Sequence, residues 1–247
     1  MNEPVRPRPP FLAIVFLALG LLAPADAQTI TPKHSRKFTR FDDCAFVPTS
    51  FVDGDSFRLR IGQDEFVFRL YYVDCPETDD RFPDRNAEQA EYFGITDAES
   101  LAAGKAAKEY VAGMLTGKAL TVFTRWASAL GSSRLPRYYA VVEVEGRGLA
   151  DLLVENGLAR LHGMSVNHPG GTNAADYIAT LGELEKAAKE RKAGAWATSR
   201  PQMQHPSVVE VSEEWEWSQW LDRLIFAGAG AGAVGAAWVL TETRRRG

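Results

Sequence analysis

The stretch FVFRLYYVDCPET, residues 66–78, is the most informative part of the chain, because it has the pattern of a strand that ends in acidic side chains. Aromatic and β-branched residues fill its first half, and a proline, which cannot donate to a strand ladder, stops it at Pro76. Arg69 lies inside this predicted strand, whereas Asp74 and Glu77 lie at its exit. Strand ends and adjoining loops are where a rigid scaffold usually presents chemistry. The stretch predicts a β fold with a functional site at its strand ends.

Two other stretches place ionisable side chains at predicted strand ends. In residues 51–59, FVDGDSFRL, an Asp-Gly turn precedes an alternating apolar and polar run, so that Asp55 stands where a strand begins. In residues 134–144, RLPRYYAVVEV, a proline marks a loop and Arg137 stands immediately before a strand. Three separated stretches therefore contribute five candidate site residues, which are Asp55, Arg69, Asp74, Glu77 and Arg137.

These residue types suit metal-assisted cleavage of a phosphodiester. A hard cation such as Ca2+ prefers carboxylate and carbonyl oxygens, which Asp55, Asp74 and a nearby backbone carbonyl would supply. Attack of water adds negative charge to the phosphoryl oxygens, and the permanently charged guanidiniums of Arg69 and Arg137 would stabilise that charge. Glu77, which follows Asp74 across a proline, would orient the water or accept its proton. The set predicts a phosphodiesterase.

Each motif alone also has a purely structural interpretation. The sequence Asp-Gly-Asp-Ser at 53–56 is typical of a hairpin turn. Arg69, in an otherwise apolar strand, could be an ion-pair partner in the fold, because a charge on the inward face is costly unless it is paired. Arg137 alone would be assigned to solvent. The catalytic interpretation depends on the motifs occurring together and in order.

The chain from Cys44 to Trp196 resembles a staphylococcal nuclease (thermonuclease) domain. The resemblance implies an α+β, mainly β fold, which is an OB-fold barrel of five strands with about three helices. It also implies a Ca2+-dependent endonuclease that cuts DNA and RNA to leave 3′-phosphates, with Asp55, Asp74 and the backbone carbonyl of Cys75 holding the metal. The blocks that carry the resemblance are 52–56, 68–78, 137–140 and 153–160.

The same resemblance implies that Glu77 is the base and that Arg69 and Arg137 are the groups that contact phosphate. All the family's catalytic side chains are present. The chain departs from the family in its substrate-binding residues, because Gly163 and Ser165 stand where the family enzyme has two tyrosines that reach the nucleotide. How this chain holds its substrate is therefore open at this point.

Helical patterns surround the predicted barrel. Thr96 and Glu99 have the spacing of a capping box and begin a helix that ends near Gly117. The stretch 79–96 is longer than in short members of the family. Further helices are predicted at 85–93, 148–156 and 174–192.

The ends of the chain predict export and a membrane anchor. Basic residues, a short apolar run and a small-residue site at 25–27 have the order of a secretory signal. The uncharged stretch 224–240, with arginines after it, predicts a transmembrane helix and places the domain on the periplasmic or extracellular face of the cytoplasmic membrane. The predicted segments are a signal peptide (1–27), a loosely ordered leader (28–43), the nuclease-like domain (44–197), a linker (198–223), the membrane helix (224–240) and a basic cytoplasmic tail (241–247).

Alternatives remain for the C-terminal segment. It could be a sorting signal trimmed after export, or a buried helix, although a buried helix explains the terminal arginines poorly. Gly228 and Gly232 have the spacing that lets two membrane helices approach closely, which suggests a weak homodimer.

The two cysteines, Cys44 and Cys75, could form a disulfide in an oxidising compartment. Sequence leaves this open, because it does not fix the distance between their Cα atoms. The four histidines show no ligand spacing, which disfavours zinc chemistry.

The net charge of −4 does not favour nonspecific binding of nucleic acid, which depends on neutralising phosphates. A locally positive cleft could compensate. The sequence thus leaves three functions open: a Ca2+-dependent nuclease, a noncatalytic OB module that binds nucleic acid or another phosphorylated ligand, and a surface interaction protein. The arginines available for such a cleft are Arg58, Arg60, Arg125, Arg134, Arg147 and Arg160.

Overall fold

Five strands form a closed ring in the computed structural model, which describes residues 29–49, 53–129 and 136–200. The order around the ring is β1, β2, β3, β6, β5 and back to β1, and all pairs are antiparallel except β3 with β6. This is the predicted OB-type barrel. Its strands are β1 (Thr39–Val47), β2 (Ser56–Ile61), β3 (Asp64–Leu70), β5 (Leu120–Ser128) and β6 (Arg137–Val144).

The β2–β3 hairpin shows why the sequence forms a barrel wall. Phe57, Leu59 and Ile61 alternate along β2 and are buried, because successive side chains of a strand point to opposite faces. The turn passes through Gly62, whose φ of 60° is readily adopted by glycine. The hairpin register places Arg69 opposite Ser56, which brings the first two sequence motifs side by side.

Closure of the barrel brings the third motif to the same place. Strand β6 runs parallel to β3, and the register pairs Val67 with Arg137. A short second sheet pairs β4 (Val73–Asp74) with β8 (Arg160–Leu161), which follows a helix late in the domain. The small strand β7 (Arg147–Gly148) pairs antiparallel with the end of β6.

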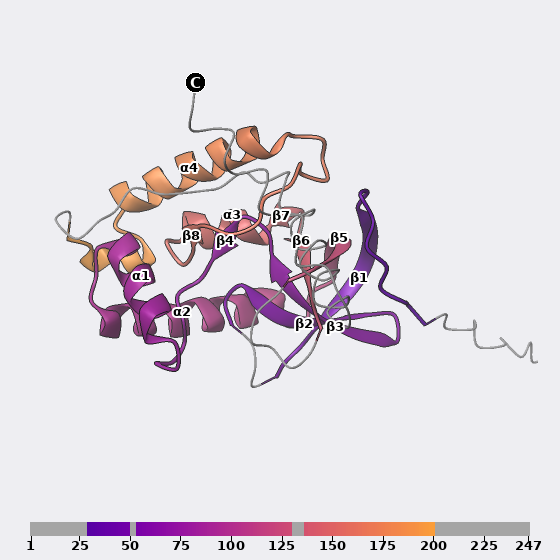
Figure 1. The fold of residues 1–247 in the computed structure, drawn as a ribbon, viewed down its shortest axis with the longest axis horizontal. Helices are drawn as coiled ribbons and strands as arrows, with labels where there is room; N and C mark the ends of the chain where they lie inside the picture. Colours follow the sequence, from indigo (N-terminus) through magenta and orange to yellow (C-terminus); the bar gives the residue numbers. More distant parts are fainter. Residues whose placement is uncertain (1–28, 50–52, 130–135, 201–247) are drawn as a thin grey trace, which may run out of the picture.

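Four α-helices lie within the described residues, gathered largely to one side of the barrel (Figure 1). The three helices expected from the family resemblance are confirmed. The helix predicted at 85–93, inside the long stretch 79–96 that we call the insertion, is also confirmed. The capping box of α2 is present as predicted. The helices are α1 (Pro83–Phe93), α2 (Asp97–Leu115), α3 (Leu149–Glu155) and α4 (Ala174–Glu190), followed by the 3-10 helix η1 (Gly194–Thr198).

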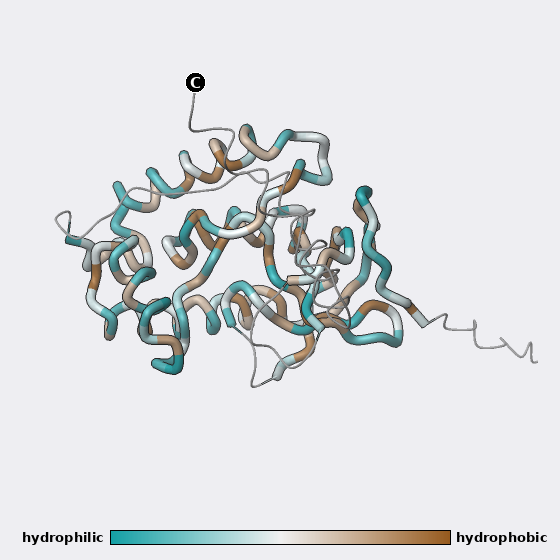
Figure 2. The backbone as a smooth tube through the Cα atoms, in the orientation of Figure 1, coloured by the Kyte–Doolittle hydropathy of each residue, from teal (hydrophilic) through white to brown (hydrophobic). Residues whose placement is uncertain are grey.

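Two hydrophobic clusters hold these layers together. The larger one joins the barrel interior to α2 and α4, through residues such as Val111 and Leu181. The smaller one fixes α1, because Phe93 is fully buried against Trp196 of η1. Hydrophobic and hydrophilic residues alternate around α4, as expected of a helix with one buried side (Figure 2). Helix α1 is thus packed firmly, although it belongs to the insertion.

The first strand begins inside the segment 28–43 that we predicted to be loosely ordered. Thr39 starts β1, and the backbone nitrogen of Ile30 donates to Asp64 Oδ2 at 2.6 Å. The Arg125 guanidinium lies over the Phe38 ring. Part of the predicted leader therefore belongs to the barrel.

The predicted signal peptide 1–27, membrane helix 224–240 and tail 241–247 lie outside the described residues, as does the linker 198–223 beyond residue 200. Among the helices of the described ranges, none combines the length and the apolar character that a membrane span requires. The predicted anchor and dimer contact remain predictions.

Both cysteines are free in the structure, so the disulfide that the sequence left open is not formed. Each thiol is buried in the large cluster. Burial raises the pKa of Cys44 to about 11 and raises the pKa of Cys75 well above its ordinary value. Neither thiol has the depressed pKa of a reactive cysteine.

Candidate functional site

Arg69 joins the two carboxylates that the sequence assigned to metal binding. Its Nη1 donates to Asp55 Oδ1 at 3.2 Å, and its Nη2 lies 3.1 Å from Asp55 Oδ2 and donates to Asp74 Oδ1 at 2.6 Å. Burial works to lower the pKa of Arg69, but Asp55 and Asp74 outweigh burial and raise it. The strand arginine is therefore both a structural ion-pair partner and the centre of the site.

Asp55 is held by its own turn as well as by Arg69. The Ser56 hydroxyl donates to Asp55 Oδ1 at 2.9 Å, and the backbone nitrogen of Cys75 donates to Oδ2 at 3.0 Å. The chain approaches so closely here that a Cβ on Gly54 would lie 2.7 Å from Cys75 Sγ. A glycine at position 54 is thus required by packing.

Asp74 is completely buried and surrounded by donors. Arg160 stands directly opposite it across the β4–β8 pair, and Arg160 Nε donates to Asp74 Oδ2 at 2.9 Å. Gln89 Nε2 donates to the same oxygen at 2.8 Å, while Arg69 and Arg85 both donate to Oδ1. Burial alone would raise the pKa of Asp74, but the three guanidiniums hold it well below its usual range. Asp74 is therefore ionised at neutral pH.

Arg137 meets Arg69 at the Ser56 hydroxyl. Arg137 Nη1 donates to Ser56 Oγ at 3.3 Å, and Arg69 Nη1 lies 3.5 Å from the same oxygen. Burial lowers the pKa of Arg137, and the like charge of Arg69 lowers it further. Two cationic groups that repel each other at one spot form a suitable place for an anion such as phosphate.

Glu77 lies at the loop after β4, with its side chain 16% exposed. Its backbone nitrogen donates to Gln89 Oε1 at 2.9 Å, and its carboxylate forms an ion pair with Arg85. Burial raises the pKa of Glu77, while Arg85 opposes the shift. Helix α2 supports this loop so closely that a Cβ on Gly104 would lie 2.1 Å from the Glu77 carbonyl oxygen. Glu77 is thus a carboxylate of raised basicity on a tightly supported loop.

All five predicted side chains therefore belong to one connected network. Sequence reasoning missed Arg85 and Gln89, which also belong to it, and considered Arg160 only as an arginine for a positive cleft. Arg85 and Gln89 come from α1, and Arg160 comes from β8. Arg85 and Gln89 are four residues apart on a predicted helix, a spacing that puts both on one face and could have pointed to them. Nothing local to Arg160 reveals its partner, because the ion pair depends on strand pairing.

Most of the described arginines that could have formed a positive cleft have partners away from the site. Arg58 and Arg60 pair with Glu65 across the hairpin, and Arg147 pairs with Glu155. Arg125 is bonded to the backbone of the N-terminal segment at Ser35 O, and Arg134 lies outside the described residues. Of that set, Arg160 alone joins the site among the residues described.

The two positions that replace the family tyrosines offer no aromatic surface. Gly163 adopts a φ of 95°, which favours glycine. Ser165 is buried, and its hydroxyl oxygen has no hydrogen-bond partner among the described residues. Neither position can supply the aromatic contact that the resemblance implies.

The oxygen donors suit Ca2+ in kind but are already engaged by nitrogen donors. Asp55 and Asp74 are hard carboxylate ligands, and the Cys75 carbonyl is a further oxygen, which accepts from Gln89 Nε2 at 3.0 Å. Within the described ranges, no group of three or more His, Cys, Asp or Glu side chains converges as a metal-binding cluster. The Arg85 guanidinium forms ion pairs with both Asp74 and Glu77.

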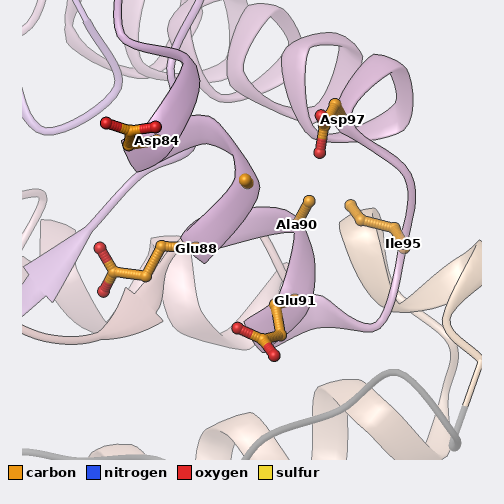
Figure 3. Close-up of a pocket in the computed structure, with 7 residues that line it drawn as sticks. Asp84, Glu88, Ala90, Glu91, Ile95 and Asp97 are labelled. Atoms are coloured by element: carbon orange, nitrogen blue, oxygen red, sulfur yellow. The ribbon is translucent and has the colours of Figure 1, made fainter.

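The other side of α1 carries a separate acidic hollow. Asp84, Glu88 and Glu91 project from α1, and Asp97 begins the next helix (Figure 3). Glu88 also pairs with Arg160 at 3.0 Å, which links the hollow to the network at one point. A surface lined by carboxylates repels phosphate groups.

The family comparison agrees with this geometry. The model of the staphylococcal nuclease homologue family matches residues 67–198, more than half of the chain. The match covers the second half of β3, the loop that carries Asp74 and Glu77, the stretch 79–96 and every helix described above. None of the curated proteins matches the chain. The closed five-stranded barrel and the network of motif residues are consistent with this match. The chain belongs to the staphylococcal nuclease homologue family.

Proposed function

We propose that this protein is an exported, membrane-tethered, Ca2+-dependent nuclease that hydrolyses phosphodiester bonds of DNA, RNA or both and leaves 3′-phosphates. The observation that carries the proposal is the meeting of Arg69 and Arg137 at Ser56, beside the carboxylates of Asp55 and Asp74. Anion-binding groups and hard oxygen ligands are thus adjacent, as phosphodiester hydrolysis requires.

The chain's own residues would divide the work. Arg69 and Arg137 would bind the phosphate and stabilise the charge that develops on it, and removing one such donor typically costs about 3 to 4 kcal/mol. Glu77 would orient the water and accept its proton, and its raised pKa makes it a stronger base than an ordinary carboxylate. Asp55, Asp74 and the Cys75 carbonyl are the groups proposed to hold Ca2+. When bound, that ion would act as a Lewis acid and template.

A noncatalytic OB module is the second candidate. It is favoured by the absence of tyrosines at Gly163 and Ser165 and by the engagement of Asp74 with arginines. Such a module would bind nucleic acid or another phosphorylated ligand without turnover, and Glu77→Gln would leave its binding unchanged.

A panel of substrates separates the two candidates. The purified full-length chain is incubated with single-stranded DNA, duplex DNA and RNA, each with Ca2+, Mg2+ or a chelator. We expect cleavage with Ca2+, loss of cleavage with chelator, and products that carry 3′-phosphates. Retention of all three substrates intact with Ca2+ present contradicts the nuclease proposal, and binding without cleavage supports the module.

Export and anchoring are tested independently of activity. We expect a mature chain that starts near Gln28 and fractionates with membranes, and release from membranes when 224–240 is deleted. A mature chain that retains residues 1–27, or stays soluble with 224–240 intact, contradicts this part of the proposal.

A further inference from the structure

We infer that the Arg85 guanidinium occupies the cation's place in this site and that Ca2+ binds in exchange for it. The inference rests on the proposed function, because it concerns the same carboxylates. It assigns to α1, an element of the insertion, control over the metal affinity of the nuclease site.

The contacts of Arg85 are those of a bridging cation. Arg85 Nη2 donates to Asp74 Oδ1, the oxygen that also accepts from Arg69. Arg85 Nε contacts Glu77 Oε1 as an ion pair, without the alignment of a hydrogen bond. One guanidinium thus neutralises a proposed metal ligand and the proposed base together.

Gln89, one helical turn later, engages the remaining groups. It is fully buried, and its amide nitrogen donates to Asp74 Oδ2 at 2.8 Å and to the Cys75 carbonyl at 3.0 Å. Its amide oxygen accepts from the Glu77 backbone nitrogen at 2.9 Å. A neutral amide fixes these groups without adding charge, so the charge that opposes a metal comes from the arginines.

Of the three arginines on Asp74, Arg85 is the one placed to leave. Its side chain is 37% exposed, whereas that of Arg69 is 14% exposed and that of Arg160 is 3% exposed. Without Arg85, Asp74 keeps both other guanidiniums and Gln89. The helix itself is held by its buried cluster, so the exchange requires movement of the side chain alone.

Electrostatics favour exchange over simultaneous binding. A divalent cation at Asp74 would meet the guanidiniums of Arg69, Arg85 and Arg160 at short range. A like charge at such a distance commonly shifts a titrating group by a pK unit or more, which is about tenfold in affinity. Removal of Arg85 removes the most accessible of these charges.

Calorimetric titration of Ca2+ alone into the full-length protein, without nucleic acid, tests the inference. Arg85→Met keeps much of the apolar stem and deletes the charge, Arg85→Lys keeps the charge, and Arg81→Met is the control, because Arg81 belongs to the same insertion but pairs with the exposed Asp79. We expect Arg85→Met to bind Ca2+ at least about tenfold tighter than wild type, and the other two variants to stay within about threefold.

Thermal unfolding with and without Ca2+ checks that each variant is folded, and Arg85→Gln gives the same comparison if Arg85→Met does not fold. The inference is overturned if the charge-deleting variant binds Ca2+ no more tightly than wild type does. It is also overturned if none of the proteins binds Ca2+. Wild-type cleavage is measured alongside. If wild type cleaves nucleic acid but Arg85→Met has an unchanged Ca2+ affinity, the inference is refuted and the nuclease proposal stands. If wild type does not cleave, the nuclease proposal is refuted, and the Ca2+ titration still decides the inference.

Discussion

Among single residues, Asp74 concentrates the ionic contacts of the site. It is fully buried and accepts from three guanidiniums and one amide. A buried charge that loses its partner is costly, because the attraction of the partner no longer offsets the cost of removing the charge from water. The stability of the domain and the geometry of the site therefore depend on the same carboxylate.

We expect Asp74→Asn to lower the free energy of unfolding by about 3 to 5 kcal/mol, since it leaves Arg69 and Arg160 without their shared counter-charge. Urea denaturation measures this. Asp79→Asn, at an exposed pair with Arg81, is the control and should change stability by less than about 1 kcal/mol. Equal effects of the two substitutions would show that the buried network does not stabilise the fold.

Substitutions of the two site arginines should differ in their effect on the free energy of unfolding. Arg69→Ala leaves two buried carboxylates short of a partner and should cost about 3 to 5 kcal/mol. Arg137→Ala removes a charge whose pKa is already lowered by burial and by Arg69, and should cost about 1 kcal/mol for its hydrogen bonds. Both should lower cleavage about a hundredfold or more. A wild-type rate of cleavage by Arg137→Ala would show that Arg137 does not bind the phosphate.

At the scale of elements, α2 fixes the loop that carries Glu77. A Cβ at Gly104 would lie 2.1 Å from the Glu77 carbonyl oxygen and 2.5 Å from that of Pro76. Both atoms are backbone, so the loop or the helix must move to make room. The loop after β4 and the first half of α2 behave as one unit.

We expect Gly104→Ala to destabilise the protein by about 1 to 3 kcal/mol or more and to reduce cleavage, because it displaces the Glu77 loop. Gly113→Ala, on the exposed side of the same helix with nothing within 4 Å, should instead stabilise by about 0.4 to 1 kcal/mol. Thermal or urea unfolding of both variants gives the comparison. Stabilisation by both would mean that the close approach of α2 to the loop is absent.

The start of α2 should be sensitive to acid. Glu99 closes the capping box with Thr96 and pairs with Arg200, and its side-chain hydrogen bond with Arg200, together with the Thr96 backbone, lowers the pKa of Glu99 from 4.5 to about 2. A carboxylate with a depressed folded pKa adds stability above its unfolded pKa and loses it as the pH falls through the folded value. The stability difference between wild type and Glu99→Gln should therefore be constant near neutrality and shrink between pH 4.5 and about 2. A difference that is independent of pH in urea titrations would contradict this.

At the scale of the whole molecule, patterns within short stretches predict the strands and place the five motif residues at or near their ends, whereas the closed barrel was expected from the family resemblance. The insertion helix and the capping box follow from the same kind of pattern. Arg160 could not be placed, because its partner Asp74 is set by the pairing of β4 with β8. Arg58 and Arg60 lie on one face of β2, where both form ion pairs with Glu65. The presence of arginines in the sequence therefore did not predict a nucleic-acid cleft.

The stretch 79–96 contributes two side chains to the site from outside the barrel. It adds Arg85 and Gln89 to a network that the motifs alone would leave more open. Because those side chains come from a helix of their own, long-range placement decides their role, and their local sequence predicts only the helix. The barrel strands and the α1 side chains that contact Asp74 thus come from different parts of the chain.

The rate of cleavage of a single-stranded DNA oligonucleotide by wild type and by Glu77→Gln, in saturating Ca2+ at neutral pH, tests the central claim most directly. We predict that wild type cleaves the oligonucleotide and that Glu77→Gln, folded to the same thermal stability within a few degrees, is about a hundredfold to ten-thousandfold slower. Equal rates for the two proteins, or no cleavage by wild type, would contradict a nuclease that uses this carboxylate as its base.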